Sequence, residues 1–275
     1  MKLSLSVRVA EGYHSKRKAS MGLEALASLA VGAGYSAICM RASQMGVQTP
    51  GHEIAEARRL LDAKDLGVSM VTGDFPIPEN SSEGPAALRN ITPYLDLADA
   101  LGSDMLRICM KTDRDIPWAQ KAADEAHERR IRLVHQCHHL SLFEQVQRSL
   151  EVVRQVDRNN FGMVYEPANL ELCGQDYGDA TIKKLAPHIF NVYLQNQRLG
   201  LEGTDIIETW VRGDVRVDQV PIWEPKGIDY SLVASGLRNV GYDGYITVHQ
   251  ASTPPIKPSE AILRSADFLK DIFGL

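Results

Sequence analysis

The chain has 275 residues, of which 44% are hydrophobic and 24% charged, and its formal net charge at pH 7 is −5. This is the composition of an ordinary folded protein, and the acidic balance argues against a nucleic-acid partner held by phosphate neutralisation. The sequence has no uncharged apolar run of about 18 residues and no secretory signal pattern, so we expect no membrane span and a cytoplasmic protein.

The four cysteines, Cys39, Cys109, Cys137 and Cys173, stand far apart and form no C-x-x-C pair. This spacing weakens the zinc-ribbon and thioredoxin interpretations. Three of them lie in or next to apolar, strand-like runs. We therefore expect reduced thiols that pack as small hydrophobic side chains.

Short apolar segments alternate with amphipathic segments along the chain. The apolar segments, which we expect to be strands, are residues 3–9, 37–41, 68–75, 105–110, 131–136, 161–166, 189–195 and 244–250. The amphipathic segments, which we expect to be helices, are residues 20–33, 50–66, 85–101, 117–130, 141–157, 178–187, 229–240 and 258–273.

Eight strand–helix units predict a single (β/α)₈ TIM barrel, with one domain over residues 1–275. The strands lack strict polar–apolar alternation, as is typical of parallel strands covered on both faces. A doubly wound open sheet has the same βα alternation and is the alternative. No G-x-G-x-x-G follows the first strand and no Walker A motif occurs, so we expect no nucleotide cofactor. Two long connections, residues 75–84 and 196–228, would cover the active face at the C-terminal ends of the strands.

The predicted C-terminal ends of the strands carry polar side chains. Basic residues stand near the ends of strands one, two and four, and amides, histidines and one carboxylate near the later ends. In chain order the set is Arg8, Arg41, Arg107, Lys111, Gln136, His138, Glu166, Tyr193, Gln195 and His249. A buried polar group without a partner costs about 1–3 kcal/mol. The whole set therefore favours a wet pocket at the barrel mouth, although each member alone also fits a hydrogen-bonded rim residue.

Seven segments carry a resemblance to a known family: residues 22–41, 56–73, 91–108, 121–139, 161–176, 189–196 and 236–250, the last with a distinctive GYDGY. In them the chain resembles the xylose isomerase-like barrels, the sugar phosphate isomerase/epimerase superfamily that also contains endonuclease IV. The resemblance implies a TIM barrel, proton transfer beside a keto group, and one divalent cation, often Mn²⁺, at the barrel mouth.

The chain departs from the metal ligands that this resemblance implies. Gln136 stands in place of a Glu that ends strand five, Glu166 in place of an Asp, Tyr193 in place of a His, and His249 in place of a final Glu. Glu166, His249 and Gln136 are the candidate ligands of one Mn²⁺ or Mg²⁺ ion, bound more weakly than in the family site. A site without metal is the alternative.

The substitutions also change the acid–base chemistry, because an amide at position 136 cannot take up a proton. We expect His249 to remove a proton next to a carbonyl, with Glu166 or His138 in the second transfer. A cation would then stabilise the enolate oxygen in place of the metal. The candidates are Arg107, Lys111 and Lys226.

Basic and aromatic residues near the predicted mouth indicate the ligand class. If Arg8, Arg41 and Arg107 converge there, together with Lys111 and Lys226, they imply a sugar acid or a sugar phosphate. Pairing of each with a neighbouring carboxylate is the plainer interpretation. Trp118 and Trp223 lie in loops of the active face, where an aromatic ring can stack on a sugar or simply pack.

We therefore expect an isomerase- or epimerase-like enzyme acting on a small keto-sugar, sugar acid or sugar phosphate. The alternatives are a dehydratase or lyase on a similar substrate, and a non-catalytic carbohydrate-binding or accessory barrel. An endonuclease-like activity is disfavoured, because the sequence shows neither a large cluster of His and carboxylate ligands nor a basic track for DNA. A homo-oligomer is compatible with the sequence.

Overall fold

Eight parallel strands close into a barrel in the computed structural model, which describes residues 1–12 and 15–275. Their bounds are β1 Lys2–Ser6, β2 Ala37–Arg41, β3 Gly67–Thr72, β4 Met105–Ile108, β5 Arg132–Gln136, β6 Phe161–Tyr165, β7 Ile189–Leu194 and β11 Tyr245–Val248. The order around the barrel is β1-β11-β7-β6-β5-β4-β3-β2, so β1 pairs with β11 and closes the sheet. This confirms the predicted barrel and excludes the open sheet.

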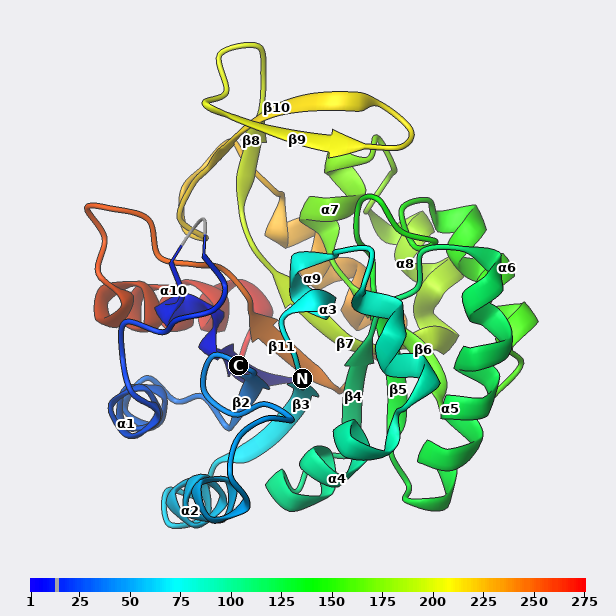
Figure 1. The fold of residues 1–275 in the computed structure, drawn as a ribbon. Helices are drawn as coiled ribbons and strands as arrows, with labels where there is room; N and C mark the ends of the chain where they lie inside the picture. Colours follow the sequence, from blue (N-terminus) through cyan, green and yellow to red (C-terminus); the bar gives the residue numbers. More distant parts are fainter. Residues whose placement is uncertain (13–14) are drawn as a thin grey trace.

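Helices follow the strands and surround the barrel (Figure 1). They are α1 Leu23–Gly32, α2 Gly51–Asp62, α3 Pro76–Glu79, α4 Thr92–Leu101, α5 Ile116–Glu128, α6 Val146–Val156, α7 Pro167–Leu172, α8 Asp179–Leu185, α9 Tyr230–Asn239 and α10 Pro258–Phe273. The helix predicted over 85–101 is in fact a 3₁₀ turn, η2 Gly84–Arg89, followed by α4. A proline is tolerated in the first turn of a helix, and Pro93 accordingly lies at the start of α4.

The connection predicted as a loop over 196–228 contains a small antiparallel sheet. Its strands are β8 Gln197–Leu199, β9 Asp205–Thr209 and β10 Gly213–Gln219, in the order β8-β10-β9. Val215 and Val217 alternate with polar residues on β10, and their side chains pack against Leu172 of α7. The sheet stands over one end of the barrel (Figure 1).

An apolar layer fills the inside of the barrel. Six neighbouring strands contribute one side chain each to it: Cys39, Met70, Met105, Val134, Val164 and Tyr193. Successive side chains on one face of a strand are two residues apart. The next inward positions are therefore Arg41, Thr72, Arg107, Gln136, Glu166 and Gln195. The strand period thus places a polar ring directly above an apolar layer.

Other predictions from composition can be compared with the structure. All four cysteines are buried and free of disulfide bonds, as expected of core thiols. Burial raises the pKa of the Cys109 thiol to about 11 and that of Cys137 to about 12. Within the residues that the structure describes, every helix is too short or too polar to cross a membrane.

Gly162 on β6 provides a test of the packing around the barrel. A Cβ atom there would lie 2.6 Å from the carbonyl oxygen of His188 and 2.7 Å from the ring of Phe190. We expect Gly162→Ala to lower the free energy of unfolding by about 1–3 kcal/mol, because overpacking forces the backbone of β7 to move. Urea unfolding measures the change. Gly32→Ala in α1, where a Cβ has open space, is the control and should be neutral or slightly stabilising; equal stability of the two variants would contradict the packing argument.

Candidate functional site

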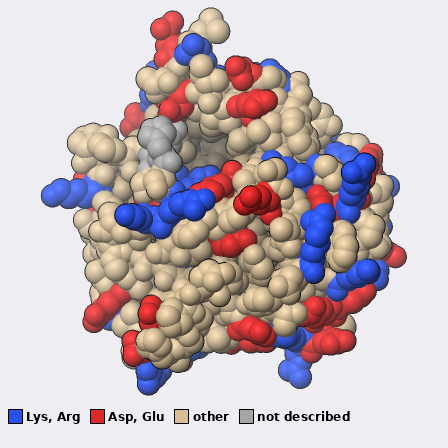
Figure 2. All heavy atoms as spheres, viewed as in Figure 1, with Lys and Arg blue, Asp and Glu red and all other residues tan. Residues whose placement is uncertain are grey.

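A cavity of about 270 Å³ lies above the polar ring, between the strand ends and the small sheet. The space-filling view shows the surface hollowed below this sheet, with basic side chains near its edge (Figure 2). The lining includes seven of the residues predicted from the sequence: Arg8, Arg41, Arg107, Gln136, His138, Gln195 and His249.

Buried Glu11 organises the basic side chains that follow β1 and β2. Its carboxylate accepts a hydrogen bond from Arg41 Nε at 2.9 Å and one from Ser43 Oγ at 2.6 Å, and Arg8 Nη1 lies 3.5 Å away. Arg8 lies in the 3₁₀ turn η1 Val7–Ala10 directly after β1, and also donates to the carbonyl of Gly12 at 2.8 Å. One carboxylate therefore holds two guanidinium groups at the cavity.

Two guanidinium nitrogens in this region are buried without a hydrogen-bond partner in the described structure, Arg41 Nη2 and Arg107 Nε. Arg107 lies near the end of β4, two residues after Met105 of the apolar layer. No described residue forms an ion pair or a hydrogen bond with Arg107. Unpaired buried donors of this kind fit an anionic ligand that enters the cavity.

Lys16 also lines the cavity, although no local pattern around it predicts this position. Its Nζ donates a hydrogen bond to the carbonyl of Pro78, in α3, at 2.6 Å. Burial, followed by the charges of Arg41, Arg8 and Arg107, lowers the pKa of the Lys16 amine to about 7. The amine is therefore partly neutral at physiological pH.

Glu166 directly follows β6 and lies behind two cavity residues. Its Oε2 atom accepts hydrogen bonds from Gln136 Nε2 and from Asn169 Nδ2, the latter at 2.8 Å, while Oε1 is buried without a partner. Burial raises the pKa of the Glu166 carboxyl to about 7, although these two amides and Arg107 act in the opposite direction. The two amides fix its orientation, and the carboxyl is buried next to the cavity without lining it.

His249 is held as a neutral imidazole. Its ring stacks on Tyr193 at 3.7 Å, its Nδ1 lies 3.0 Å from Ser6 Oγ, and its Nε2 lies 3.5 Å from Arg41 Nη1. Burial, followed by the charges of Arg41 and Arg107, lowers the pKa of His249 well below its usual range. Proton uptake by this ring is therefore disfavoured.

His138 has a similar environment after β5. Its Nδ1 lies 2.9 Å from the carbonyl of His139, a contact that requires a proton on Nδ1 and leaves Nε2 as an acceptor. Burial lowers the pKa of His138 well below its usual range. The ring is thus suited to accept a hydrogen bond from a hydroxyl group.

Amide side chains form much of the remaining polar lining: Gln136, Asn169, Gln195, Gln197 and Gln219. Gln197 Nε2 donates to the carbonyl of Ala168 at 2.7 Å, and Asn169 Nδ2 donates to the carbonyl of Cys137 at 2.9 Å. The Oε1 atoms of Gln136 and Gln219 are buried without partners in the described structure. Such acceptors match the hydroxyl groups of a carbohydrate.

Five predicted site residues do not line the cavity; one is Glu166, which lies behind Gln136 and Asn169. Tyr193 lies below the cavity in the apolar layer, with its hydroxyl 3.1 Å from Cys39 Sγ. Lys111 does not line the cavity; its backbone N–H donates to the Asp115 carboxylate at 2.8 Å at the start of a turn. Lys226 is an exposed residue with a φ of 67°, in a turn.

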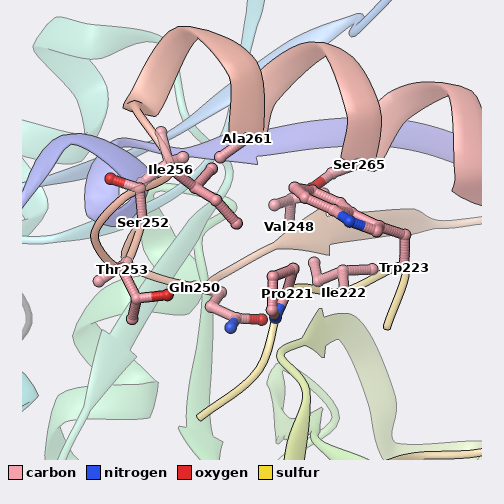
Figure 3. Close-up of a pocket in the computed structure, with 12 residues that line it drawn as sticks. Pro221, Ile222, Trp223, Val248, Gln250, Ser252, Thr253, Ile256, Ala261 and Ser265 are labelled. Carbon is pink, nitrogen blue, oxygen red and sulfur yellow. The ribbon is translucent and has the colours of Figure 1, made fainter. Parts of the chain in front are cut away.

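Trp223 is the fifth of these residues. It lines a separate void of about 20 Å³ together with Val248 and Ser265 of α10, and not the polar cavity (Figure 3). The guanidinium of Arg264 lies 4.2 Å from its ring centroid. Trp118, also considered for sugar stacking, is exposed, with Arg89 and Lys121 over its ring. Neither tryptophan lines the polar cavity.

The cavity also contains residues that were not predicted. The small sheet supplies Gln197, Asp205, Ile206, Ile207 and Gln219, and α7 supplies Asn169. Alternation along residues 213–219 is the sequence signal that could have revealed the sheet. His139 directly follows His138 after the fifth strand, a polar strand end that the sequence does indicate, whereas no comparable signal marks Lys16.

The side chains at the mouth do not fit a divalent cation. In the described part of the chain, no three His, Cys, Asp or Glu side chains are grouped as metal ligands. Glu166 is already held by two amides, and both nitrogens of His249 have contacts. The positive charges of Arg8, Lys16, Arg41 and Arg107 would also repel a dication. The predicted ligand set of Glu166, His249 and Gln136 is therefore not supported by the chemistry around it.

Buried neutral histidines make stability depend on pH. Burial lowers the pKa of His135 to about 3 and that of His139 to about 4, and His138 and His249 are lowered as well. The unfolded chain takes up protons at these sites below about pH 6.5, whereas the folded chain does not. Each histidine should lower the free energy of unfolding by up to about 1.4 kcal/mol per pH unit on acidification. The raised pKa of Glu166 has the opposite effect on the free energy of unfolding over part of this pH range. It is a single group, whereas four histidines act in the other direction.

Urea unfolding at about pH 7.5 and about pH 5.5 measures this dependence. We expect lower stability at the acidic pH, and a smaller difference for His135→Gln, which removes a buried histidine outside the cavity. His52→Gln, at an exposed position in α2, is the matched control and should keep the wild-type difference. A His135→Gln variant with an unchanged pH dependence would contradict the assignment.

Comparisons with known proteins agree with the architecture. No curated protein matches the sequence. Solved structures with the same fold include the probable 3-DHS dehydratase AsbF from Bacillus anthracis (TM-score 0.72, 14% identity, 98% of this chain and 99% of that chain). They also include a D-psicose 3-epimerase determined in the presence of D-fructose (TM-score 0.72, 12% identity, all of both chains). A third is the IolI protein with a bound zinc atom (TM-score 0.72, 14% identity, 100% of this chain and 98% of that chain).

These identities indicate a shared fold and no more. The family model of the xylose isomerase-like TIM barrel, however, matches residues 27–272, nearly the whole chain. The chain therefore belongs to the xylose isomerase-like TIM barrel family.

Proposed function

We propose that this chain is an enzyme that moves a proton next to the carbonyl group of a small anionic carbohydrate, as an isomerase or epimerase does. The observation that carries the proposal is the carboxyl of Glu166. Two amides hold one of its oxygens at the end of β6, the other oxygen is unpartnered, and its pKa is raised to about 7. A group that titrates near the working pH is the most effective general acid or base.

Glu166 is a better proton carrier than His249, which the sequence had favoured. Protonation of His249 would add a charge beside Arg41 in a buried site, whereas deprotonation of Glu166 creates a charge that Arg107 attracts. His249 would then orient the Arg41 guanidinium, and His138 would accept a hydrogen bond from a substrate hydroxyl. Arg107, with an unpartnered Nε, would neutralise negative charge on the substrate.

Two kinds of lining group support the proposed substrate class. The guanidinium groups of Arg41 and Arg107 have unpartnered nitrogens suited to a carboxylate or a phosphate. The amides of Gln136 and Gln219 have unpartnered oxygens suited to hydroxyl donors. A sugar acid or sugar phosphate carries both features, and a neutral sugar lacks the first.

Loss of water from a similar substrate starts with the same proton transfer. Removal of a proton beside a carbonyl gives an enolate, which either takes a proton at another carbon or expels a neighbouring hydroxyl group. Two of the structural neighbours bear the names of an epimerase and of a probable dehydratase. The Glu166 site is compatible with both outcomes, and product analysis separates them.

Solvent exchange tests the role of Glu166. In D₂O, we expect the wild-type protein to exchange the proton beside the carbonyl of at least one member of a panel of keto-sugar acids and keto-sugar phosphates, followed by NMR. Glu166→Gln should lower this exchange by on the order of 10²–10⁴-fold, because the amide cannot take up the proton. Glu56→Gln, at an exposed position on α2, is the control and should leave the exchange unchanged. If no substrate in the panel exchanges, or Glu166→Gln exchanges as the wild type does, the chain is better described as a binding protein.

Ligand-induced thermal stabilisation tests the anionic substrate class. Sugar acids or sugar phosphates should raise the melting temperature by mass action. Arg107→Met should weaken their binding by about 10–100-fold, since a hydrogen bond to a charged group contributes about 1.5–3 kcal/mol. Arg59→Met, at an exposed position on α2, should bind as the wild type does. Stabilisation by neutral sugars alone would exclude an anionic substrate.

A further inference from the structure

The amine of Lys16 is the feature of the cavity that the proposed function leaves unused. It lines the cavity and donates one hydrogen bond, to the carbonyl of Pro78 at 2.6 Å. No carboxylate among the described residues forms an ion pair with it. A lysine inside a protein is ordinarily paired with an acid or extended into water. Lys16 is instead enclosed with three guanidinium groups.

This environment favours the neutral form of the amine. The groups that act on Lys16 come from several elements: Arg8 and Glu11 from the segment after β1, Arg41 from β2 and Arg107 from β4. Three of the four are cations, and burial adds to their effect, which brings the pKa of the amine to about 7. A lysine that is desolvated or placed beside another cation is a nucleophile, because its free electron pair is available.

No serine, threonine, cysteine or tyrosine is among the described residues that line the cavity. The four cysteines are buried elsewhere, and the Tyr193 hydroxyl contacts Cys39 below the cavity. The same mouth also lacks a ligand set that fits a divalent cation. The proposed reaction needs a group that activates the carbonyl, and the described residues offer the Lys16 amine, whose hydrogen-bond partner is the Pro78 carbonyl.

We propose that Lys16 forms an imine with the carbonyl group of the substrate. This inference rests on the proposed function, since it supplies the electron-withdrawing group for the proton transfer at Glu166. The amine nitrogen attacks the carbonyl carbon, a C–N bond forms, and the carbonyl oxygen leaves as water with both amine protons. Uptake of one proton gives the cationic imine, and its N–H can keep the hydrogen bond to the Pro78 carbonyl.

The remaining steps balance without any further reactant. The cationic imine draws electrons from the neighbouring C–H bond, and the Glu166 carboxylate takes that proton, leaving a neutral enamine. Return of the proton to the opposite face of the same carbon restores the imine, now of the epimer. One water then hydrolyses the imine, which releases the product and the free amine of Lys16. The water released at the start is consumed at the end, and no oxidant or reductant takes part.

Reductive methylation tests whether Lys16 forms imines at neutral pH. Formaldehyde is small enough to enter the cavity, reacts only with neutral amines, and its imine is trapped by cyanoborohydride. The full-length protein is treated at pH 7, cleaved after glutamate and analysed by mass spectrometry. The peptide over residues 12–24 carries both Lys16 and the exposed Lys18, which serves as an internal control. We expect Lys16 to be methylated at least about tenfold faster than Lys18, because exposed lysines ordinarily titrate near about 10.4. Methylation of Lys16 at the rate of Lys18 or more slowly would overturn the proposal.

Substitution tests whether the imine belongs to the reaction. Lys16→Arg keeps a positive charge but cannot form an imine, so it should lose proton exchange in D₂O while still being stabilised by sugar acids. Lys18→Arg should keep both properties. Wild-type exchange by Lys16→Arg would overturn the imine and leave proton transfer by Glu166 intact. Loss of the proposed function would appear differently, as unchanged exchange in Glu166→Gln with rapid methylation of Lys16.

Discussion

Alternate side chains of a barrel strand point toward the barrel axis, and this geometric constraint decides where the chemistry of the protein lies. Six strands place an apolar side chain inward at one level, from Cys39 on β2 to Tyr193 on β7. Two residues later the same strands place polar side chains inward, among them Arg41, Arg107 and Glu166. The polar ring lies above this apolar layer, and its residues Arg41, Arg107 and Glu166 are buried. Its charges therefore act on one another more strongly than they would at an open surface.

The concentration of cations in this enclosed space sets the proton affinities of its neighbours. Cationic neighbours and burial both lower the basicity of the histidines, so His138 and His249 stay neutral. For a carboxyl the two effects oppose each other, and burial prevails at Glu166. For the Lys16 amine they add. As a result, the Glu166 carboxyl and the Lys16 amine both have a pKa of about 7. A group with a pKa near the working pH can both take up and release a proton readily.

The sequence was sufficient for the fold, because eight βα units and polar strand ends are local patterns that a barrel preserves. It also located seven cavity residues, all of them at or just beyond strand ends. It failed where position depends on loop paths. Trp223 turns toward α10, Lys226 lies exposed in a turn, and Lys16 reaches back to α3, and none of these directions follows from local periodicity. The small sheet was missed because its strands are short and one face of each strand is polar and exposed to solvent, so their apolar residues do not form a continuous run.

Fixed side-chain charges make a different demand on the fold than a bound metal ion would. A divalent cation is delivered after folding and needs several carboxylates to hold it, whereas guanidinium groups must be buried as the chain folds. Glu11 reduces that cost for Arg8 and Arg41, because it accepts from both and lies beside the cavity without lining it. Among the described residues Arg107 has no hydrogen-bond or ion-pair partner, so a bound anion would add to the attraction that the Glu166 charge already supplies. An anionic substrate would therefore complete the electrostatic balance of the mouth, and its affinity would come largely from charge that the folded protein already holds in place.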